Sequence, residues 1–363
     1  MKTKNRLSII SITILFVLIL QVSLPAEAFF WKEYSNYIYY HCADWGPDLE
    51  NPDEEKNYFV KQIIFYEEKR WIGNEVYFCS MNPDGSEKKE IVKLFEDTEL
   101  YLDINGNTSF MDICAKKRKA AIAFSAGDWP QVGLWTINLD GTDFRRIVEM
   151  KWTKDFQYRV NHPSWLLEGE QLIYEEKWLH EVKDSEFYIV KVDKDGKNKV
   201  YLTSKEDGGD KNRFPSVSPD EKKIAYTHFR TEIKKGGRDL WVMDIDGKNK
   251  KLLYENERHY ADYPEWSPDG RKLYVVYVSN FAVVDAATGK QEINELLKFD
   301  GKYWIPRKMH WSNKYGYLLD GAGSIGLIRN DLSYYVPQKQ VGGGYVKTKN
   351  RRDLSKYNYK WGN

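Results

Sequence analysis

Short apolar and aromatic runs recur along this chain, and a turn sequence rich in Asp, Asn and Gly follows each of them. The copies of this turn are Asn82-Pro83-Asp84-Gly85, Asn138-Leu139-Asp140-Gly141, Asp193-Lys194-Asp195-Gly196, Asp244-Ile245-Asp246-Gly247 and, more loosely, Asp285-Ala286-Ala287-Thr288-Gly289. Glycine accepts the positive φ that a tight chain reversal needs. Each copy therefore predicts a tight turn between two antiparallel strands.

A second phrase recurs upstream of these turns and predicts another strand pair. Its copies are His162-Pro163-Ser164-Trp165, Phe214-Pro215-Ser216-Val217, Tyr263-Pro264-Glu265-Trp266 and the degenerate Met309-His310-Trp311-Ser312. Successive turn glycines from Gly85 to Gly289 lie 56, 55, 51 and 42 residues apart, which is close to the length of a four-stranded propeller blade. The repeats predict an all-β propeller with four-stranded antiparallel blades.

The third strand of each unit is the easiest to recognise, and its copies predict six blades. These copies are residues 75–80, 133–138, 186–192, 239–244, 281–285 and 324–329. We assign the propeller to residues 58–341. The segment 29–57 contains a strand-like stretch at Tyr34 to Cys42, which could pair with the last blade and close the ring, because closure removes exposed sheet edges.

Two of these repeats resemble the propeller repeats of the TolB family: Pro264-Glu265-Trp266-Ser267-Pro268-Asp269-Gly270 and Leu240-Trp241-Val242-Met243-Asp244-Ile245-Asp246-Gly247. The resemblance extends over about residues 58–340 and is best in the third to fifth repeats. It implies an exported, periplasmic, six-bladed propeller that binds partners. TolB also carries an α/β domain before its propeller. Residues 29–57 are too few for that domain, so the resemblance concerns the propeller alone.

The N-terminal segment is typical of a secretory signal peptide. Lys2 to Arg6 is basic, Ile9 to Leu20 is mainly apolar, and Ala26-Glu27-Ala28 offers a cleavage site. We therefore predict a signal peptide at residues 1–28 and a periplasmic or extracellular mature protein. An uncleaved anchor over Leu7 to Leu24 is the alternative.

Charge and cysteine content limit the partners and cofactors. The 363-residue chain has 55 basic and 54 acidic residues, and loss of residues 1–28 leaves 52 and 53. Such a balance argues against a nucleic-acid partner. Cys42, Cys79 and Cys114 allow one disulfide with a thiol left over, or three buried thiols, and match no zinc or haem motif. The sequence predicts no cofactor and no metal site.

The connections at one end of the predicted blades are long, and we call that end the long-loop face. They comprise residues 126–132, 150–159, 176–185, 205–213, 229–238, 256–262 and 300–307. Long loops on a rigid scaffold commonly bind ligands, and Trp, Tyr and Arg often anchor interfaces. The predicted partner-binding residues are Trp129, Trp152, Trp178, His180, Arg230, Arg238, Arg258, His259, Tyr260 and Trp304. The alternative is that these aromatic side chains cover the ends of the blades.

Four residues align at the start of the innermost strands, near the predicted channel mouth: Asn161, Arg213, Asp262 and Arg307. Two converging guanidinium groups could clamp a carboxylate or phosphate. They could instead form structural ion pairs with Asp210 and Asp262.

Catalytic motifs are missing from the sequence. Gly321 to Gly326 fits the Gly-x-Gly-x-x-Gly pattern, but the residues after it continue as a strand, so a glycine-rich hairpin is predicted. The six histidines share no repeat position, and His259 with Asp262 is the one close His/Asp pair on the long-loop face. We assign no catalytic residues.

Residues 342–363 form a basic, aromatic segment after Gly342-Gly343-Gly344. Such a tail is attracted to anionic surfaces, or is simply a disordered terminus. The leading hypothesis is a non-enzymatic exported propeller that binds a protein or peptide in the cell envelope through its long-loop face. The alternatives are an enzyme that acts on a carbohydrate or envelope polymer at the channel mouth, and a structural module of an envelope assembly.

Overall fold

The computed structural model describes residues 34–348, with gaps at 69, 97–108, 126–129, 181–184, 207–210, 231–236, 256–260, 278–279, 297, 300–301, 304–305, 313, 322–323, 329–336 and 343–344. The predicted signal peptide and residues 349–363 lie outside this range. The chain divides into two compact units. The larger comprises Ile38–Ile64 and Gly73–Gly344, and the smaller Met1–Tyr37, Phe65–Ile72 and Tyr345–Asn363.

Nearly all described secondary structure is β, apart from the one-turn helix η2 (Leu167–Gly169). None of the described helices has the length and apolar character that a membrane crossing requires.

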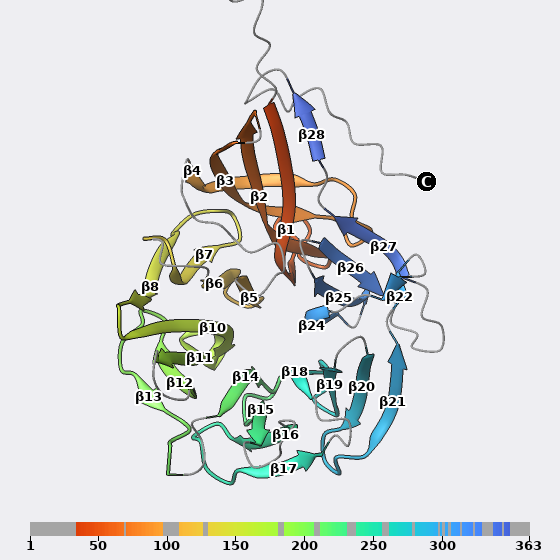
Figure 1. Ribbon diagram of the computed structural model, residues 1–363. Helices are drawn as coiled ribbons and strands as arrows, with labels where there is room; N and C mark the ends of the chain where they lie inside the picture. Colours follow the sequence, from red (N-terminus) through yellow and green to blue (C-terminus); the bar gives the residue numbers. More distant parts are fainter. Residues whose placement is uncertain are drawn as a thin grey trace, which may run out of the picture. The chain divides into compact units, whose positions relative to one another are not determined.

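The strands form successive antiparallel sheets that follow the chain order (Figure 1). The first sheet has the order β28-β1-β2-β3-β4, with β28 (Tyr345–Thr348), β1 (Tyr34–Pro47), β2 (Glu55–Glu67), β3 (Arg70–Met81) and β4 (Lys89–Glu96). The second contains β5 (Ser109–Cys114), β6 (Lys119–Phe124), β7 (Gly133–Asn138) and β8 (Arg145–Glu149). The third contains β9 (Lys151–Trp152), β10 (Phe156–Leu166), β11 (Gln171–His180), β12 (Glu186–Asp193) and β13 (Val200–Tyr201).

The later sheets repeat the four-stranded arrangement. They are β14 (Asn212–Val217), β15 (Lys223–Arg230), β16 (Gly237–Asp244) and β17 (Lys251–Tyr254); then β18 (Asp262–Trp266), β19 (Lys272–Tyr277), β20 (Asn280–Asp285) and β21 (Gln291–Leu296); and finally β24 (Pro306–Ser312), β25 (Gly316–Gly321), β26 (Ser324–Ile328) and β27 (Pro337–Gly342). A two-stranded ribbon, β22 (Lys298–Phe299) with β23 (Lys302–Tyr303), precedes the last of them. The predicted four-stranded antiparallel units are confirmed, and the number of blades stays a prediction.

The first strands of neighbouring sheets in the larger unit pack against one another in succession. β5 contacts β10, β10 contacts β14, β14 contacts β18, and β18 contacts β24. Side chains complete the cycle, because His310 of β24 lies 2.8 Å from Asp44 of β1 and Asp44 accepts a hydrogen bond from Ile113 of β5. A cyclic succession of four-stranded antiparallel sheets is the β-propeller architecture.

The short turns share one face, as the sequence predicts. In each Asx-rich turn the glycine has positive φ, from 74° at Gly289 to 89° at Gly141. The turn between the third and fourth strands then bonds to the turn between the first two: Leu139 N–H donates to Arg118, Lys194 to Glu170, Ile245 to Lys222 and Ala286 to Arg271. The long connections consequently lie at the other end of the strands.

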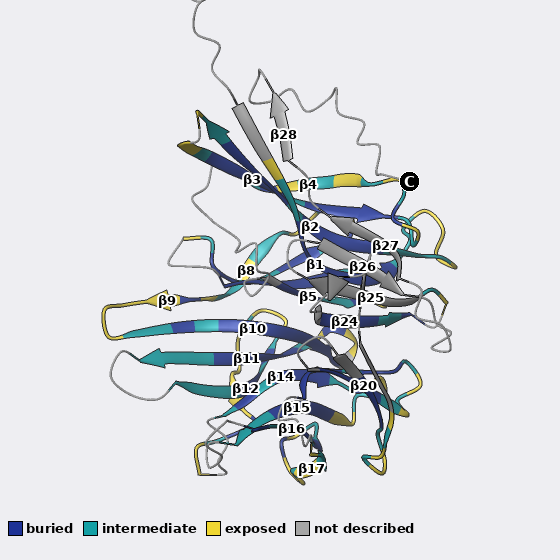
Figure 2. Ribbon diagram, turned by 45° about the vertical axis from the view of Figure 1, so that its right-hand side comes forward, coloured by how far each residue is buried: buried dark blue, intermediate teal, exposed yellow. Residues whose placement is uncertain are grey.

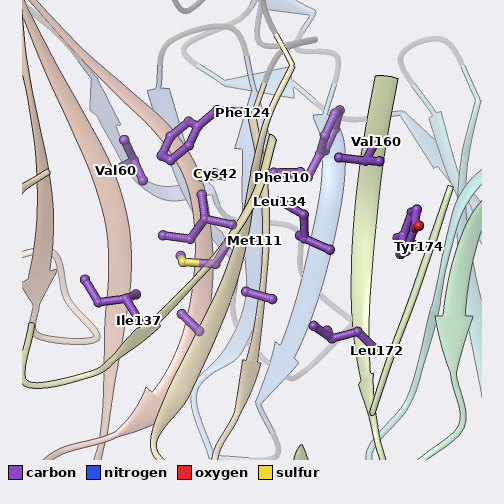
Figure 3. Close-up of a cluster of buried hydrophobic side chains, with 14 of the residues drawn as sticks. Cys42, Val60, Phe110, Met111, Phe124, Leu134, Ile137, Val160, Leu172 and Tyr174 are labelled. Carbon is purple, nitrogen blue, oxygen red and sulfur yellow. The ribbon is translucent and has the colours of Figure 1, made fainter. Parts of the chain in front are cut away.

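Buried residues, dark blue in Figure 2, lie along the strands of the successive sheets. The largest cluster joins the first three sheets and includes Val60, Phe124, Leu134, Leu172 and Tyr174 (Figure 3). Val, Ile and aromatic residues suit such a double-sided sheet interior. Cys42, Cys79 and Cys114 are buried thiols that form no disulfide with one another, and burial raises the pKa of Cys79 to about 12. The buried-thiol alternative is the one that the structure contains.

Parts of several predicted long connections are strand instead, at residues 151–152, 156–159, 176–180, 212–213, 229–230, 237–238, 262, 302–303 and 306–307. β11 continues to His180, so residues 176–180 extend the sheet, although the sequence assigns 176–185 to a loop. They pair with β10 from Phe156 to Val160. The prediction was wrong here because Glu175, Glu176 and Lys177 hide the alternation of a strand. In the structure Glu175 pairs with Arg213 and Glu176 with Lys199.

The glycine-rich hairpin is confirmed: β25 and β26 are antiparallel, with Gly321 opposite Ser324. In the smaller unit β28 pairs with the start of β1, from Tyr34 opposite Thr348 to Tyr37 opposite Tyr345. Residues 345–348, which the sequence assigns to the C-terminal segment, are thus a strand.

Candidate functional site

The first strand of each large sheet places one polar residue at the same level, and we call this set the polar ring. Its members are Asp44, Asp112, Ser164, Ser216, Glu265 and His310. Three of them accept a hydrogen bond from a backbone N–H of the next sheet. Asp44 Oδ2 accepts from Ile113 N at 2.7 Å, Asp112 Oδ2 from Trp165 N at 2.8 Å, and Ser164 Oγ from Val217 N at 3.2 Å.

The tryptophans of the Pro-x-Trp phrase complete this arrangement. Trp165 Nε1 donates to the Asp112 carbonyl at 3.1 Å, and Trp266 Nε1 donates to the Ser216 carbonyl at 3.0 Å. A buried indole N–H needs an acceptor. The recurrence of Trp at this position of the repeats therefore has a structural reason: the side chain joins neighbouring sheets.

Carboxyl groups dominate the charge of the polar ring. Burial raises the pKa of Asp112 to about 7 against the attraction of Lys308, and burial also raises the pKa of Glu265 to about 8. Lys308 Nζ donates to the Met111 carbonyl at 2.7 Å and lies 3.9 Å from Asp112 Oδ1. A pocket of about 470 Å³ opens here on the short-turn side, lined by Asp112, Ser164, Ser216 and Glu265 among others.

Sequence reasoning missed one constellation in the ring. Ligand-type atoms of Asp44, Asp112 and His310 lie within 4.8 Å of one another. Three such ligands are the usual minimum for a metal site, although the Lys308 ammonium already stands beside Asp112. The three residues come from degenerate copies of the repeat, so only an alignment of the first strands could have found them.

A layer of rings separates the polar ring from the long-loop side. His162, Phe214 and Tyr263 have φ of 48°, 55° and 53°. Each lies in the β-bulge of its strand, between Asn161 and Ser164, Arg213 and Ser216, or Asp262 and Glu265. His162 lies 3.6 Å from Phe110, 4.6 Å from Phe214 and 5.4 Å from Tyr263, between ring centroids. Since β10 and β18 belong to sheets that are not neighbours, His162 and Tyr263 meet across the centre of the ring of sheets. Burial and the nearby Arg213 charge hold the pKa of His162 well below its usual value.

The predicted channel-mouth residues lie beyond this layer. Asn161, Arg213 and Asp262 each immediately precede the bulge of their strand, so they share one register. Arg213 Nε lies 3.1 Å from Glu175 Oε1, and Asp262 pairs with Arg238. Arg213 thus forms a structural ion pair, which is the alternative to the clamp, but its partner is Glu175 of the preceding sheet, and the partner of Asp262 is Arg238. The Arg307 side chain and Asp210 lie outside the described residues.

The β10–β11 hairpin divides the predicted tryptophans between its two faces. Trp178 packs on Phe156 and Tyr158, with centroids 5.3 and 4.9 Å away, and its Nε1 donates to Glu176 at 2.7 Å. Trp152 lies opposite Gln157 on β10, is 45% exposed and stacks under the Arg159 guanidinium at 5.1 Å.

The remaining predicted partner-binding residues have other surroundings. His180 ends β11 opposite Phe156. Arg230 pairs with Asp239 at 2.7 Å and with Glu255 at 2.5 Å. Trp129, Arg258, His259, Tyr260 and Trp304 lie outside the described residues. A binding role for any of these residues stays a prediction.

Comparisons with known proteins agree on the fold. No protein-family model matches the chain, and no curated protein matches it. Among solved structures, a nidogen from a nidogen–laminin complex superposes with a TM-score of 0.51 and 11% identity, over 85% of this chain and 98% of that one. TolB from Acinetobacter baumannii gives 0.47 and 14%, over 84% and 81%. An identity of 11% with the nidogen structure shows a common fold and nothing of function. Together with the cyclic sheet order, this superposition shows that the chain is a β-propeller, as the TolB-like repeats predict.

Proposed function

We propose that this chain is a non-enzymatic propeller that binds a protein or peptide partner through its long-loop face. The observation that carries the proposal is Trp152, a large aromatic side chain that is 45% exposed beside Arg159 at the end of an extended hairpin. β9 is exposed over both of its residues (Figure 2). Trp and Arg are both among the residue types most enriched in interface hot spots, and the rigid sheet beneath them lowers the entropic cost of binding.

Affinity capture with paired variants tests this function. Purified wild-type protein, Trp152→Ala and the control Leu252→Ala would each be used on an envelope extract. Leu252 is also exposed, at 44%, but lies on β17. We expect a defined partner that is retained by Leu252→Ala and lost or weakened at least tenfold by Trp152→Ala, since hot-spot truncations commonly cost that much. The partner, once purified, should reproduce the difference. A partner set that is the same for all three proteins contradicts the proposal.

We further propose that the protein acts after export, in the periplasm or outside the cell. The support is the basic, apolar and small-x-small order of residues 1–28. N-terminal sequencing of the mature protein should begin at Phe29. A mature chain that retains residues 1–28 would favour the anchor over Leu7 to Leu24.

A second candidate function is hydrolysis of a carbohydrate polymer at the short-turn side of the channel. It is favoured by Asp112 and Glu265, whose pKa values of about 7 and about 8 suit proton transfer near neutral pH and whose side chains line the pocket of about 470 Å³. Turnover of cell-wall polysaccharide fragments by the wild type, abolished in Asp112→Asn, would support it. No turnover by the wild type would leave partner binding as the function.

A further inference from the structure

One face of the β10–β11 hairpin carries two opposed cations. Arg159 lies directly opposite Lys177, and Asn161 lies opposite Glu175. Alternate residues of a strand point to the same side, and the bulge begins only after Asn161. Arg159, Lys177 and Glu175 therefore share a face. Because Glu175 pairs with Arg213 of β14 at 3.1 Å, this face is turned toward the next sheet.

Arg213 brings a third cation to the same place. Its guanidinium lies 4.7 Å from the centroid of the Phe187 ring, and the Lys177 ammonium lies 5.3 Å from that centroid. Phe229 stacks on Phe187 at 6.1 Å. Two cations thus approach one aromatic ring, which contributes attraction of its own. We call Arg159, Lys177 and Arg213 the cationic face.

The cationic face has an excess of positive charge among the described residues. Two carboxylates act on it. Both oxygens of Glu175 are engaged, Oε1 by Arg213 Nε and Oε2 by Phe214 N at 3.2 Å. The Asp262 charge also attracts Arg213, but Asp262 is paired with a fourth cation, Arg238. Arg159 Nη2 donates to Gln157 at 2.8 Å, while its buried Nε has no partner in the described structure.

The pKa of Lys177 is affected by the same excess of positive charge. Burial, together with the Arg213 and Arg159 charges and against the attraction of Glu175, lowers the pKa of Lys177 to about 8. An anion placed between the three cations would raise the pKa of Lys177 again, since an opposite charge within a few ångströms favours the charged form.

We propose that Arg159, Lys177 and Arg213 form a carboxylate-binding site, and that an acidic side chain of the protein partner occupies it. The inference rests on the proposed function and names the chemistry of the partner. Trp152 lies opposite Gln157 and contacts Arg159, so the site continues the exposed surface on which that function depends. Guanidinium and ammonium donors match a carboxylate, and the neighbouring Trp and Phe rings suit the apolar flanks of a peptide.

NMR of the full-length protein with ¹³C-dimethylated lysines tests the site directly. The probes are the end-capped peptide Gly-Leu-Glu-Leu-Gly, its Gln counterpart and inorganic phosphate, and Lys177→Arg identifies the Lys177 signal. We expect saturable shifts of that signal with the Glu peptide, a rise of its pKa and no response to the Gln peptide. The affinity should fall above about pH 8, where free Lys177 loses the proton that the carboxylate needs. Glu175, Arg159 and Arg213 are the charged groups that face it.

Two variants of matched design separate binding from folding. Arg159→Gln should lower the affinity for the Glu peptide by roughly tenfold or more, because hydrogen bonds to charged groups are strong. Arg146→Gln removes another guanidinium that stacks on a tryptophan, 5.7 Å from Trp135, and should leave the affinity unchanged. Equal responses to the Glu and Gln peptides, or an unaltered affinity in Arg159→Gln, would overturn the inference. If inorganic phosphate bound as tightly as the Glu peptide, the site would be one for a free anion, and the assignment to a peptide would be overturned.

The captured partner distinguishes failure of this inference from failure of the function. If partner binding depends on Trp152 but is unaffected by Arg159→Gln and Lys177→Gln, the carboxylate site is wrong and the binding function stands. If no partner depends on Trp152, the proposed function fails, and the peptide titration still reports whether the cationic face binds carboxylates.

Discussion

Single residues in the polar ring bear charges that the fold accommodates at a cost. Asp112 and Glu265 titrate near neutral pH in the folded chain, well above the values of about 4 that they have when unfolded. The folded state therefore binds more protons than the unfolded state between about pH 4 and about pH 7. Stability is greatest at the acidic end of this window and falls as the pH rises.

Asp112→Asn should remove much of that slope. The amide oxygen can still accept from Trp165 N, and no charge has to be buried at high pH. We expect the free energy of unfolding to vary less with pH in the variant, by on the order of 3 kcal/mol from pH 4 to pH 7. Urea denaturation at a series of pH values measures it.

Asp269→Asn is a control, because the pH dependence that Asp269 gives to the free energy of unfolding has the opposite sign. Hydrogen bonds from Ser267 and Arg271 lower the pKa of Asp269, so its contribution is present above about pH 4 and lost in acid. Identical pH slopes in the wild type and Asp112→Asn would contradict the assignment of a raised pKa to Asp112.

At the scale of elements, the turn glycines do two jobs that can be separated. Gly196 has φ of 75°, and a Cβ there would lie 2.0 Å from the Ile147 carbonyl oxygen of the preceding sheet. Gly270 has φ of 68°, but a Cβ there would meet only Pro219 Cδ at 3.9 Å. The first turn is restricted by conformation and by packing, the second by conformation alone.

Gly270→Ala should cost about 1 kcal/mol, the usual strain of a left-handed residue. Gly196→Ala should cost roughly 3 kcal/mol or more, because backbone must also move. Thermal and urea unfolding compare the two. Equal losses would show that the outer strand β8 yields easily to the turn of the next sheet.

The strands themselves were predictable where the repeat is regular. β7 was predicted at both ends and β12, β16 and β20 within two residues, because an Asx-rich turn ending in Gly follows each run. β26, which follows the glycine-rich hairpin, was also predicted within two residues, whereas β3 begins at Arg70, five residues before the predicted start. The extended β10–β11 hairpin was not, since Lys177 and the glutamates before it have the composition of a loop. Arg159 and Lys177 were therefore not linked in the sequence. The polar ring was equally hidden, as its contacts join residues such as Asp44 and His310 from opposite ends of the repeats.

At the scale of the whole molecule, the C-terminal segment offers a test of surface attraction. Deletion of residues 342–363 would remove β28 and its pairing with β1. Deletion of 349–363 instead removes five basic residues and one acidic residue while keeping that pair. If the segment contacts anionic surfaces, the shorter deletion should abolish co-sedimentation with phosphatidylglycerol vesicles at low salt and leave the melting temperature unchanged. Unchanged sedimentation would end this proposal.

The layer of His162, Phe214, Tyr263 and Phe110 lies between the polar ring and the level of Asn161, Arg213 and Asp262, at the centre of the propeller. A polypeptide cannot pass through the centre of the propeller while these rings touch. An occupant of the pocket beside the polar ring and an occupant of the cationic face would therefore not compete for space, and the molecule could hold both at once.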